Sequence, residues 1–466
     1  MEEDLYEHAS FRDRISTVTS AGKRNWIYAL KPAGAYYKWR NLLSYTYLAV
    51  FFVLPFIKVN GTPLFMINFV ESRFIVFGKI FWPQDFFILA LAMVTMIVFI
   101  ALFTVIYGRL FCGYACPQTV FLEFVFRRIE WWIEGSPARQ KALNEGPWTN
   151  EKIWKKTVKH TLFLLFSLWI AITFLAYIIG IDEVWHLMME QASIHLGLWA
   201  GIAVFTALFY GVFAFVREIV CTTICPYGRL QGVLYDKDTM QISYDYGRGE
   251  PRGRFKKSET RTTGDCIDCK KCVLVCPTGI DIRDGVQMDC VGCTACMDAC
   301  DEVMDKIGFP KGLIRYASEN QIAKRAPFHF SSRMKAYSAL LMILVVAMGF
   351  MIATRQTIDT YISRVKGQLY QEVVPDRIGN LFEAKIINKT IAEIPVELKL
   401  ENKSGEIKLI GAATMVLKPE SVNDFTFFVQ IPKSEILERS NPLTIGIYAN
   451  GKRIQKIRTK FLGPFK

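Results

Sequence analysis

Eight cysteines between Cys266 and Cys300 constrain the fold of this chain more than any other feature. They form two near-identical runs: Cys-x2-Cys-x2-Cys-x3-Cys-Pro begins at Cys266, and Cys-x2-Cys-x2-Cys-x3-Cys begins at Cys290. This spacing is typical of a bacterial two-cluster ferredoxin. A zinc ribbon needs four ligands rather than eight, and a disulfide scaffold needs an oxidising compartment. The spacing therefore predicts two [4Fe-4S] clusters and a role in electron transfer.

In such modules the fourth cysteine of each run binds the cluster of the other run. The first cluster is accordingly expected on Cys266, Cys269, Cys272 and Cys300. The second cluster is expected on Cys290, Cys293, Cys296 and Cys276.

The rest of the chain is too apolar for a soluble protein that carries a polar ferredoxin. Of its 466 residues, 52% are hydrophobic, and the mean hydropathy is +0.22. Long apolar runs with few charges predict about five helical membrane spans. These runs are Leu42–Ile57, Phe86–Tyr107, Thr161–Gly180, Ile194–Val216 and Tyr337–Thr354. Asp85, at the start of the second run, is interpreted as an interfacial charge.

The pattern predicts a multi-domain membrane protein with an α-helical bundle. After residue 366, short segments rich in β-branched and aromatic residues, such as Leu381–Ile387 and Ile394–Leu400, predict a C-terminal Ig-like β-sandwich. The expected parts are an arm at 1–40, a four-span membrane domain at 41–236, a ferredoxin-like domain at 237–336, a fifth span at 337–354 and the β-domain at 367–466.

The distribution of basic residues predicts the orientation in the membrane. The formal net charge is +13, and Lys and Arg are dense in residues 1–40, 108–157 and the ferredoxin region but sparse in 58–85 and 181–193. The positive-inside rule places the N-terminus and the ferredoxin in the bacterial cytoplasm, and five spans place the β-domain in the periplasm. All cysteines then face a reducing compartment. We expect no nucleic-acid partner, because in a membrane protein such charge mostly reflects topology.

The four remaining cysteines form two pairs that suggest an internal repeat. Each pair follows two expected spans, as Arg109-x2-Cys112-x3-Cys116-Pro117 and as Arg217-x3-Cys221-x3-Cys225-Pro226. This pattern indicates a duplicated two-helix unit in parallel orientation, with both pairs at the same membrane depth.

The spacing within each pair favours metal binding. On an intact helix, residues four apart have Cβ atoms about 5–6 Å apart. A disulfide needs about 3.5–4.5 Å, so these pairs are poor disulfides. Thiolates select Cu(I), zinc or iron–sulfur clusters, and inert buried thiols are the alternative. The predicted catalytic and metal-binding residues are Cys112, Cys116, Cys221 and Cys225, holding copper or a third cluster.

The order of these motifs resembles the cytochrome c oxidase accessory protein family (CcoG, also called FixG or RdxA). The resemblance covers nearly the whole chain. It rests on Gly108–Thr119 (GRLFCGYACPQT), Cys221–Gln231 (CTTICPYGRLQ), the double ferredoxin run and the β-domain. One departure is Cys300-Asp301, where the family often has a proline after the cysteine.

The resemblance implies a cupric reductase that reduces Cu(II) to Cu(I) for assembly of the copper centre of cbb3-type cytochrome c oxidase. Its implied partners are oxidase subunits or copper-delivery factors and a cytoplasmic electron donor. Two other classes remain open: a membrane quinol dehydrogenase or ferredoxin-type electron-transfer subunit, and a non-catalytic copper carrier or assembly scaffold. No Gly-x-Gly-x-x-Gly follows a predicted strand, so direct NAD binding is not expected.

Overall fold

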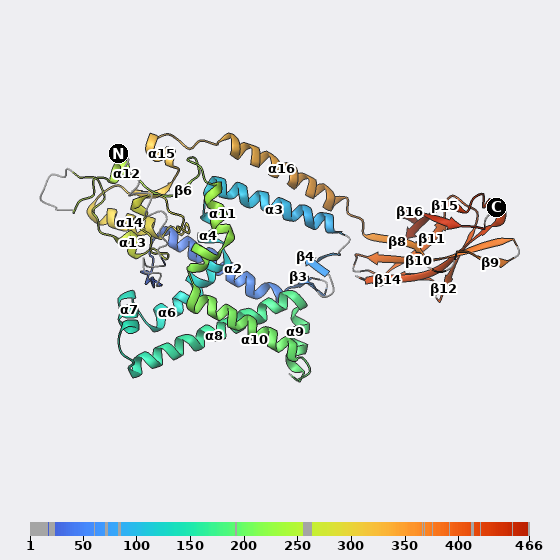
Figure 1. The fold of residues 1–466 in the computed structure, drawn as a ribbon, viewed down its shortest axis with the longest axis horizontal. Helices are drawn as coiled ribbons and strands as arrows, with labels where there is room; N and C mark the ends of the chain where they lie inside the picture. Colours follow the sequence, from blue (N-terminus) through green and yellow to red (C-terminus); the bar gives the residue numbers. More distant parts are fainter. Residues whose placement is uncertain are drawn as a thin grey trace. The chain divides into compact units, whose positions relative to one another are not determined.

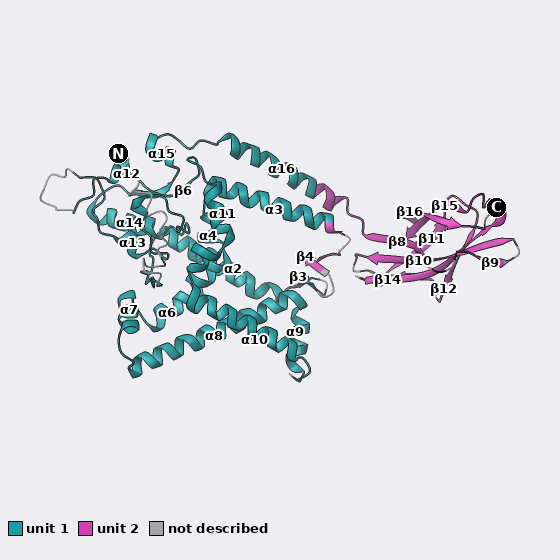
Figure 2. Cartoon of the chain, viewed as in Figure 1, with its two compact units in different colours: residues 1–57, 63–69, 87–348 teal, residues 58–62, 70–86, 349–466 magenta. Residues whose placement is uncertain are grey.

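The computed structural model describes residues 17, 24–59, 61–69, 73–82, 85–191, 193–254, 263–365, 367, 369–374, 376–390, 392–411, 414–419, 421–449 and 451–464. Most of the expected arm, residues 1–16 and 18–23, lies outside these ranges. The chain divides into two compact units (Figure 2). Unit 1 comprises residues 1–57, 63–69 and 87–348, and unit 2 comprises 58–62, 70–86 and 349–466.

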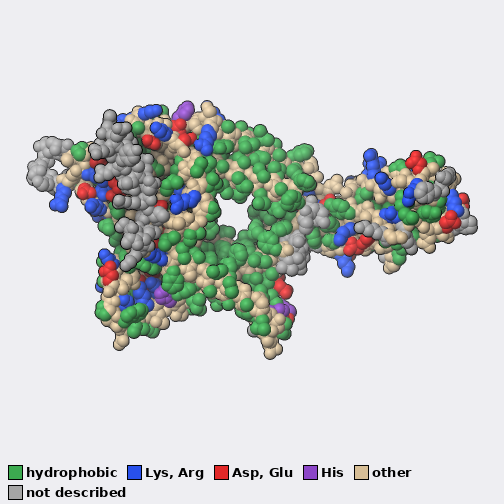
Figure 3. Space-filling view, in the orientation of Figure 1, with side chains coloured by type: hydrophobic (Ala, Val, Ile, Leu, Met, Phe, Trp, Pro, Cys, Tyr) green, Lys and Arg blue, Asp and Glu red, His purple; other side chains and the backbone are tan. Residues whose placement is uncertain are grey.

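Four helices in the described part of the chain are long and apolar enough to cross a membrane. They are α3 (Phe86–Tyr107), α8 (Asn150–Ile179), α10 (Leu196–Gly211) continued by the π-helical turn η4 (Val212–Val216), and α16 (Ser332–Ala353). They match the last four expected spans, although α16 begins at Ser332 rather than at 337. Hydrophobic side chains cover the visible surfaces of α3 and α16 (Figure 3), as lipid-facing helices require.

The first expected span, 42–57, differs from the others. Helix α2 (Ala35–Val53), followed by the short 3-10 turn η1 (Leu54–Phe56), is not among the four apolar helices. Its C-terminal end nevertheless contacts α8: the Phe52 ring stacks on Trp169, and the Tyr177 hydroxyl donates to the Phe51 carbonyl. Arg40 and Ser44 of α2 are fully buried. A helix that turns polar side chains toward protein needs less apolar composition than one that faces lipid.

Shorter helices complete the bundle of unit 1 (Figure 1). They are α4 (Leu110–Tyr114), α5 (Pro117–Phe121), the π-helical turn η3 (Leu122–Phe126), α6 (Arg127–Ile133), α7 (Pro137–Glu145), α9 (Ile181–Met189), the π-helical turn η5 (Val220–Ile224) and α11 (Pro226–Leu234). Their core is aromatic: Phe126 stacks on Phe213 with ring centroids 4.5 Å apart and meets Phe163 edge-on. This core holds α5, η3, α8 and η4 together.

The ferredoxin part of unit 1 is built on two antiparallel strands, β6 (Gln241–Tyr244) and β7 (Ile314–Ala317). The cysteine loops lie between them in sequence. Its helices are α12 (Tyr246–Gly249), α13 (Lys271–Leu274), the 3-10 turn η6 (Ile282–Asp284), α14 (Ala295–Ile307) and α15 (Glu319–Lys324). Its apolar core includes Ile242, Met297 and Leu313, and the cysteines pack against this core.

Unit 2 contains the expected β-sandwich. One sheet has the order β12-β14-β10-β8 with β9 paired to β10, and the other has the order β13-β11-β15-β16. The strands are β8 (Ile358–Arg364), β9 (Gln371–Val374), β10 (Arg377–Asn388), β11 (Ile394–Leu400), β12 (Glu406–Ile410), β13 (Met415–Leu417), β14 (Ser421–Pro432), β15 (Ser440–Ala449) and β16 (Lys452–Leu462). Alternate residues of both sheets, such as Phe382, Phe427 and Phe461, form one core.

The sandwich begins earlier in the chain than expected, because β8 starts at Ile358 and not after 367. A short turn η7 (Lys433–Glu435) joins β14 to β15. Short strands also lie between α2 and α3. They are β1 (Lys58–Val59), β2 (Thr62–Pro63), β3 (Phe65–Asn68), β4 (Arg73–Val76) and β5 (Lys79–Phe81).

Asp85, which is interpreted from the sequence as an interfacial charge, is a buried ion-pair centre of unit 2. Its carboxylate lies 2.6 Å from Arg355 Nη2 and 2.6 Å from Lys389 Nζ, and Lys389 also pairs with Asp359. Burial alone would raise the pKa of Asp85, but the hydrogen bonds from Arg355 and Lys389 hold it below its ordinary value. The residue before α3 is thereby tied to the residues that follow α16 and to the end of β10.

Replacing Asp85 with Asn is expected to destabilise unit 2 by about 3 kcal/mol, because Lys389 and Arg355 lose a buried partner. Thermal unfolding of the full chain in detergent, followed by circular dichroism, measures this loss. Since the pKa of Asp85 is lowered in the fold, its contribution is complete above its ordinary pKa of 3.8 and disappears as pH falls through the folded value. Asp424→Asn, on an exposed position of β14, is the control. Equal melting temperatures for the two variants at pH 7 would contradict this assignment.

Candidate functional site

The ferredoxin thiols fall into the two sets that the spacing predicts. Cys300 lies within electrostatic range of Cys272, Cys266 and Cys269; burial, together with these thiols, raises the pKa of Cys300 to about 12. A small cavity is lined by the same four cysteines. We call them the first thiol set: Cys266, Cys269, Cys272 and Cys300.

The second thiol set is Cys276, Cys290, Cys293 and Cys296. Cys276 lies within electrostatic range of the other three members, and burial raises the pKa of Cys290 to about 12 and of Cys293 to about 11. Thiols that burial keeps protonated become thiolates when they bind metal, as [4Fe-4S] ligands do. The residues present therefore fit two clusters.

Both ferredoxin runs have the same backbone conformation around their second cysteine. The residues on either side of Cys269, Asp268 and Lys270, have positive φ, and so do the residues on either side of Cys293, Gly292 and Thr294. Alternation of right- and left-handed residues turns successive N–H groups toward one centre, as in anion-binding nests of iron–sulfur sites. The two runs differ in that a glycine stands in the second run where an aspartate stands in the first.

The membrane cysteines do not lie on intact helices. Cys112 is in α4 and Cys221 is in the π-helical turn η5, whereas Cys116 and Cys225 have extended backbone and precede α5 and α11. The cause is the proline after each second cysteine. A proline has no N–H to continue a helix, but it is well suited to the first position of a new one.

The two pairs nevertheless converge, as the repeat predicts. Cys221 lies within electrostatic range of Cys116, Cys112 and Cys225; burial, together with these thiols, raises its pKa to about 12. The pKa of Cys112 is raised to about 11, mainly by burial. We call these four residues, Cys112, Cys116, Cys221 and Cys225, the membrane thiol set.

Each repeat supplies hydrogen bonds to the other repeat's thiols or backbone. Gln231, fully buried on α11, donates from Nε2 to Cys112 Sγ at 3.5 Å, and the Thr119 hydroxyl is hydrogen-bonded to Cys221. Gln118 donates to the Arg217 carbonyl. Sequence reasoning missed these roles, because a side chain's partner across a repeat interface is set by tertiary packing. The reciprocal bonds fix the thiols relative to one another.

The membrane thiol set lies directly against the second thiol set. A Cβ on Gly113 would clash with the Gly292 backbone and lie 2.9 Å from Cys293 Cα, and a Cβ on Gly292 would lie 2.6 Å from the Arg109 carbonyl oxygen. Cys112 and Cys221 also pack against the apolar cluster that contains Cys293. The two loops therefore touch backbone to backbone, which only glycine permits. We call this contact the Gly113–Gly292 junction.

Further bonds hold the junction closed. The first turn of α2 is capped from the ferredoxin, because the Asp298 carboxylate accepts hydrogen bonds from Tyr36 N at 3.1 Å and Tyr37 N at 2.7 Å. Arg40 Nε donates to the Gly113 carbonyl at 2.6 Å, and the Tyr114 and Thr294 hydroxyls lie 3.0 Å apart. The ferredoxin is thus docked on the helices of its own unit.

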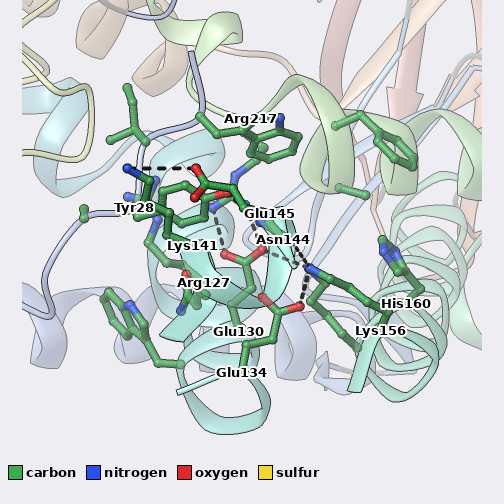
Figure 4. A pocket seen from close by; sticks show the side chains of 18 of the residues that line it. Tyr28, Arg127, Glu130, Glu134, Lys141, Asn144, Glu145, Lys156, His160 and Arg217 are labelled. Carbon is green, nitrogen blue, oxygen red and sulfur yellow. Dashed lines mark hydrogen bonds and ion pairs between the residues drawn. The ribbon is translucent and has the colours of Figure 1, made fainter. Parts of the chain in front are cut away.

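A buried ionic network stands behind the second membrane motif (Figure 4). Arg217 binds Glu130 through two nitrogens at 2.7 and 2.8 Å. Lys156 and Lys159 approach Glu134 at 2.7 and 2.9 Å. These side chains border a cavity of about 690 Å³ that also exposes His160. The network secures the residue that begins the second Cys-x3-Cys-Pro motif.

Among the described residues, no three His, Cys, Asp or Glu side chains are close enough to hold one metal ion. This applies to the ferredoxin sets and to the membrane set alike. The ligands of a four-iron cluster each bind a different iron.

These features define a class of protein: a membrane-bound iron–sulfur electron-transfer protein with a C-terminal Ig-like domain. Family models agree with each part. A 4Fe-4S dicluster domain matches residues 216–319, a 4Fe-4S binding domain matches 89–136, and the IG-like fold at the C-terminal of FixG matches 348–464. The second of these regions contains Cys112 and Cys116.

Curated relatives place the chain more narrowly. It is 34% identical to protein RdxA of Cereibacter sphaeroides over 77% of this chain and 78% of RdxA. It is 29% identical to the nitrogen fixation protein FixG of Rhizobium meliloti over 89% and 88% of the two chains. The chain belongs to the FixG/RdxA family. A solved FixG-related protein from Vibrio parahaemolyticus overlaps 23% of the chain at 15% identity with a TM-score of 0.20.

Gly292→Ala is expected to loosen the Gly113–Gly292 junction, whereas Asp268→Ala at the equivalent position of the first run is not. Both positions have positive φ, but Asp268 already carries a Cβ, and the new Cβ at Gly292 would meet the Arg109 carbonyl. We expect a stability loss of about 1–2 kcal/mol from backbone strain alone. Maleimide labelling of Cys112, mapped by peptide mass spectrometry, should be faster in Gly292→Ala. Equal labelling in the two variants would mean that the junction tolerates a side chain.

Proposed function

We propose that this protein delivers single electrons through its ferredoxin to the membrane thiol set, where Cu(II) is reduced to Cu(I) for assembly of the copper centre of a cbb3-type cytochrome c oxidase. The observation that carries the proposal is the Gly113–Gly292 junction. It brings the loop of Cys293 against the segment that carries Cys112, so electrons need to cross only a packed backbone contact.

The chemistry of the donor set supports copper as the acceptor. The clusters, when bound, supply one electron at a time. Reduction of Cu(II) to Cu(I) consumes one electron and releases no leaving group. Thiolates prefer Cu(I) over the harder Cu(II). Burial raises the pKa of Cys112 and Cys221, so these thiols ionise when a cation arrives to balance the charge.

A third [4Fe-4S] cluster is the second occupant that an observation favours. The match of a 4Fe-4S binding domain to residues 89–136, which contain Cys112 and Cys116, supports it. In that case the membrane thiol set acts as a further relay, and copper is reduced at its exposed edge. The pathway through the ferredoxin is the same in both cases.

The proposed location is the bacterial cytoplasmic membrane, with the ferredoxin in the cytoplasm and the β-domain in the periplasm. The asymmetric distribution of Lys and Arg supports this orientation. The proposed partners are the subunits or copper-delivery factors of the oxidase and a cytoplasmic electron donor.

A single-turnover experiment tests the proposal. The full chain is purified anaerobically, reduced, freed of excess reductant and mixed with Cu(II), while a chelator reports Cu(I) and absorbance reports oxidation of the clusters. Replacing Cys112, Cys116, Cys221 and Cys225 with serine is expected to slow Cu(I) formation at least about tenfold, because these thiolates hold the acceptor. Unchanged Cu(I) formation with intact ferredoxin clusters would disprove the assignment.

Iron analysis of the same preparations identifies the occupant. About eight irons per chain in both proteins mean that the membrane thiols hold no cluster. About twelve in the parent protein and about eight in the serine variant mean that they hold a third one.

A further inference from the structure

Arg109 is a buried cation at the Gly113–Gly292 junction, and none of the carboxylates in the described part of the chain pairs with it. Its side chain donates to the carbonyl of Cys290, at 3.3 Å from Nη1, and to the carbonyl of Gly228 from Nη2. Only 7% of the residue is exposed, and Nε has no hydrogen-bond partner. Within the described part of the chain, no Asp or Glu forms an ion pair with it. Among the described residues, its charge is therefore uncompensated.

The arginine near the second membrane motif is neutralised. Arg217 lies four residues before Cys221, whereas Arg109 lies three residues before Cys112. Arg217 forms a bidentate pair with Glu130 and lies 3.5 Å from Glu218. The two membrane motifs therefore differ in the counter-charges of their nearby arginines. A buried guanidinium without a carboxylate costs folding free energy, so its retention beside the second thiol set calls for a role.

Arg40 adds a second such charge from the other side. It is 1% exposed, donates from Nε to the Gly113 carbonyl and lies over the Phe124 ring at 5.0 Å. It is within electrostatic range of Cys293, as Arg109 is of Cys290.

The carboxylates near these two arginines serve other groups. Glu123 is paired with Arg127, and Asp298 accepts the N–H groups of Tyr36 and Tyr37. Asp289 is buried next to Cys290 and has an interaction of its own. The balance of charge differs at the first thiol set. Arg283 is the buried guanidinium near Cys272, and it is paired with both Asp268 and Asp281.

We propose that Arg109 and Arg40 raise the reduction potential of the cluster held by the second thiol set above that of the cluster held by the first. An added electron makes a cluster more negative, and a buried cation stabilises the reduced form strongly because little solvent screens it. The electron then rests on the cluster that adjoins the membrane thiol set. Arg109 and Arg40 act through their positive charge and do not bind the cluster. The inference rests on the proposed clusters and does not require copper as their electron acceptor.

Redox titration of the full chain in detergent, followed by EPR, tests this. Arg109→Gln removes the charge and keeps hydrogen-bond donors, and Arg109→Lys keeps the charge. The signal of the second cluster is identified by Cys293→Ser. We expect two midpoint potentials, with the second cluster higher. Arg109→Gln should lower that potential alone, and Arg109→Lys should largely preserve it.

Three results would overturn the inference: a second cluster with the lower potential in the parent protein, unchanged potentials in Arg109→Gln, or equal shifts for the Gln and Lys variants. Iron content controls for assembly. If Arg109→Gln loses iron, Arg40→Gln carries the same expectation, and Arg109→Lys must still keep the potential. Because the potentials are measured without copper, a failure here differs from a failure of Cu(II) reduction.

Discussion

The contact between Gly113 and Gly292 is the constraint on which the rest of unit 1 depends. Two loops can approach to backbone distance only where neither has a Cβ, and here each belongs to a cysteine motif. The cap that Asp298 provides to α2 and the hydrogen bond from Arg40 to Gly113 both act at this contact. The iron–sulfur module is therefore built into the membrane bundle and is not tethered to it by a linker.

The two membrane motifs share a backbone geometry but differ in their surroundings. Both repeats break their helix at a Cys-Pro step, which places Cys116 and Cys225 at equivalent helix starts. The reciprocal contacts of Thr119 and Gln231 require both copies. The surroundings differ, since one repeat turns toward the second thiol set and the other toward an ionic network of glutamates and lysines.

The β-domain is stabilised by a hydrophobic core of its own. Its core is formed by alternation along strands such as β10 and β14, which pair in register over their whole length. Asp85 forms ion pairs with Arg355 and Lys389 within unit 2. The ion-pair partners of Asp85 lie hundreds of residues away in the sequence, and no local sequence pattern predicts such pairs.

The sequence by itself determined the chemistry. Thiol spacing specified which cysteines share a set, and period-two alternation specified the sandwich. Apolar length predicted five spans, and the last four of them are long apolar helices in the structure. These are local properties, fixed by helix rise, strand pleat and ligand geometry. Only the tertiary structure decided that α2 could be less apolar, because its polar face is buried in protein. It also decided that Gly292 meets the carbonyl of Arg109. Those outcomes depend on which surfaces pack together, and packing between distant segments leaves no periodic trace in a single sequence.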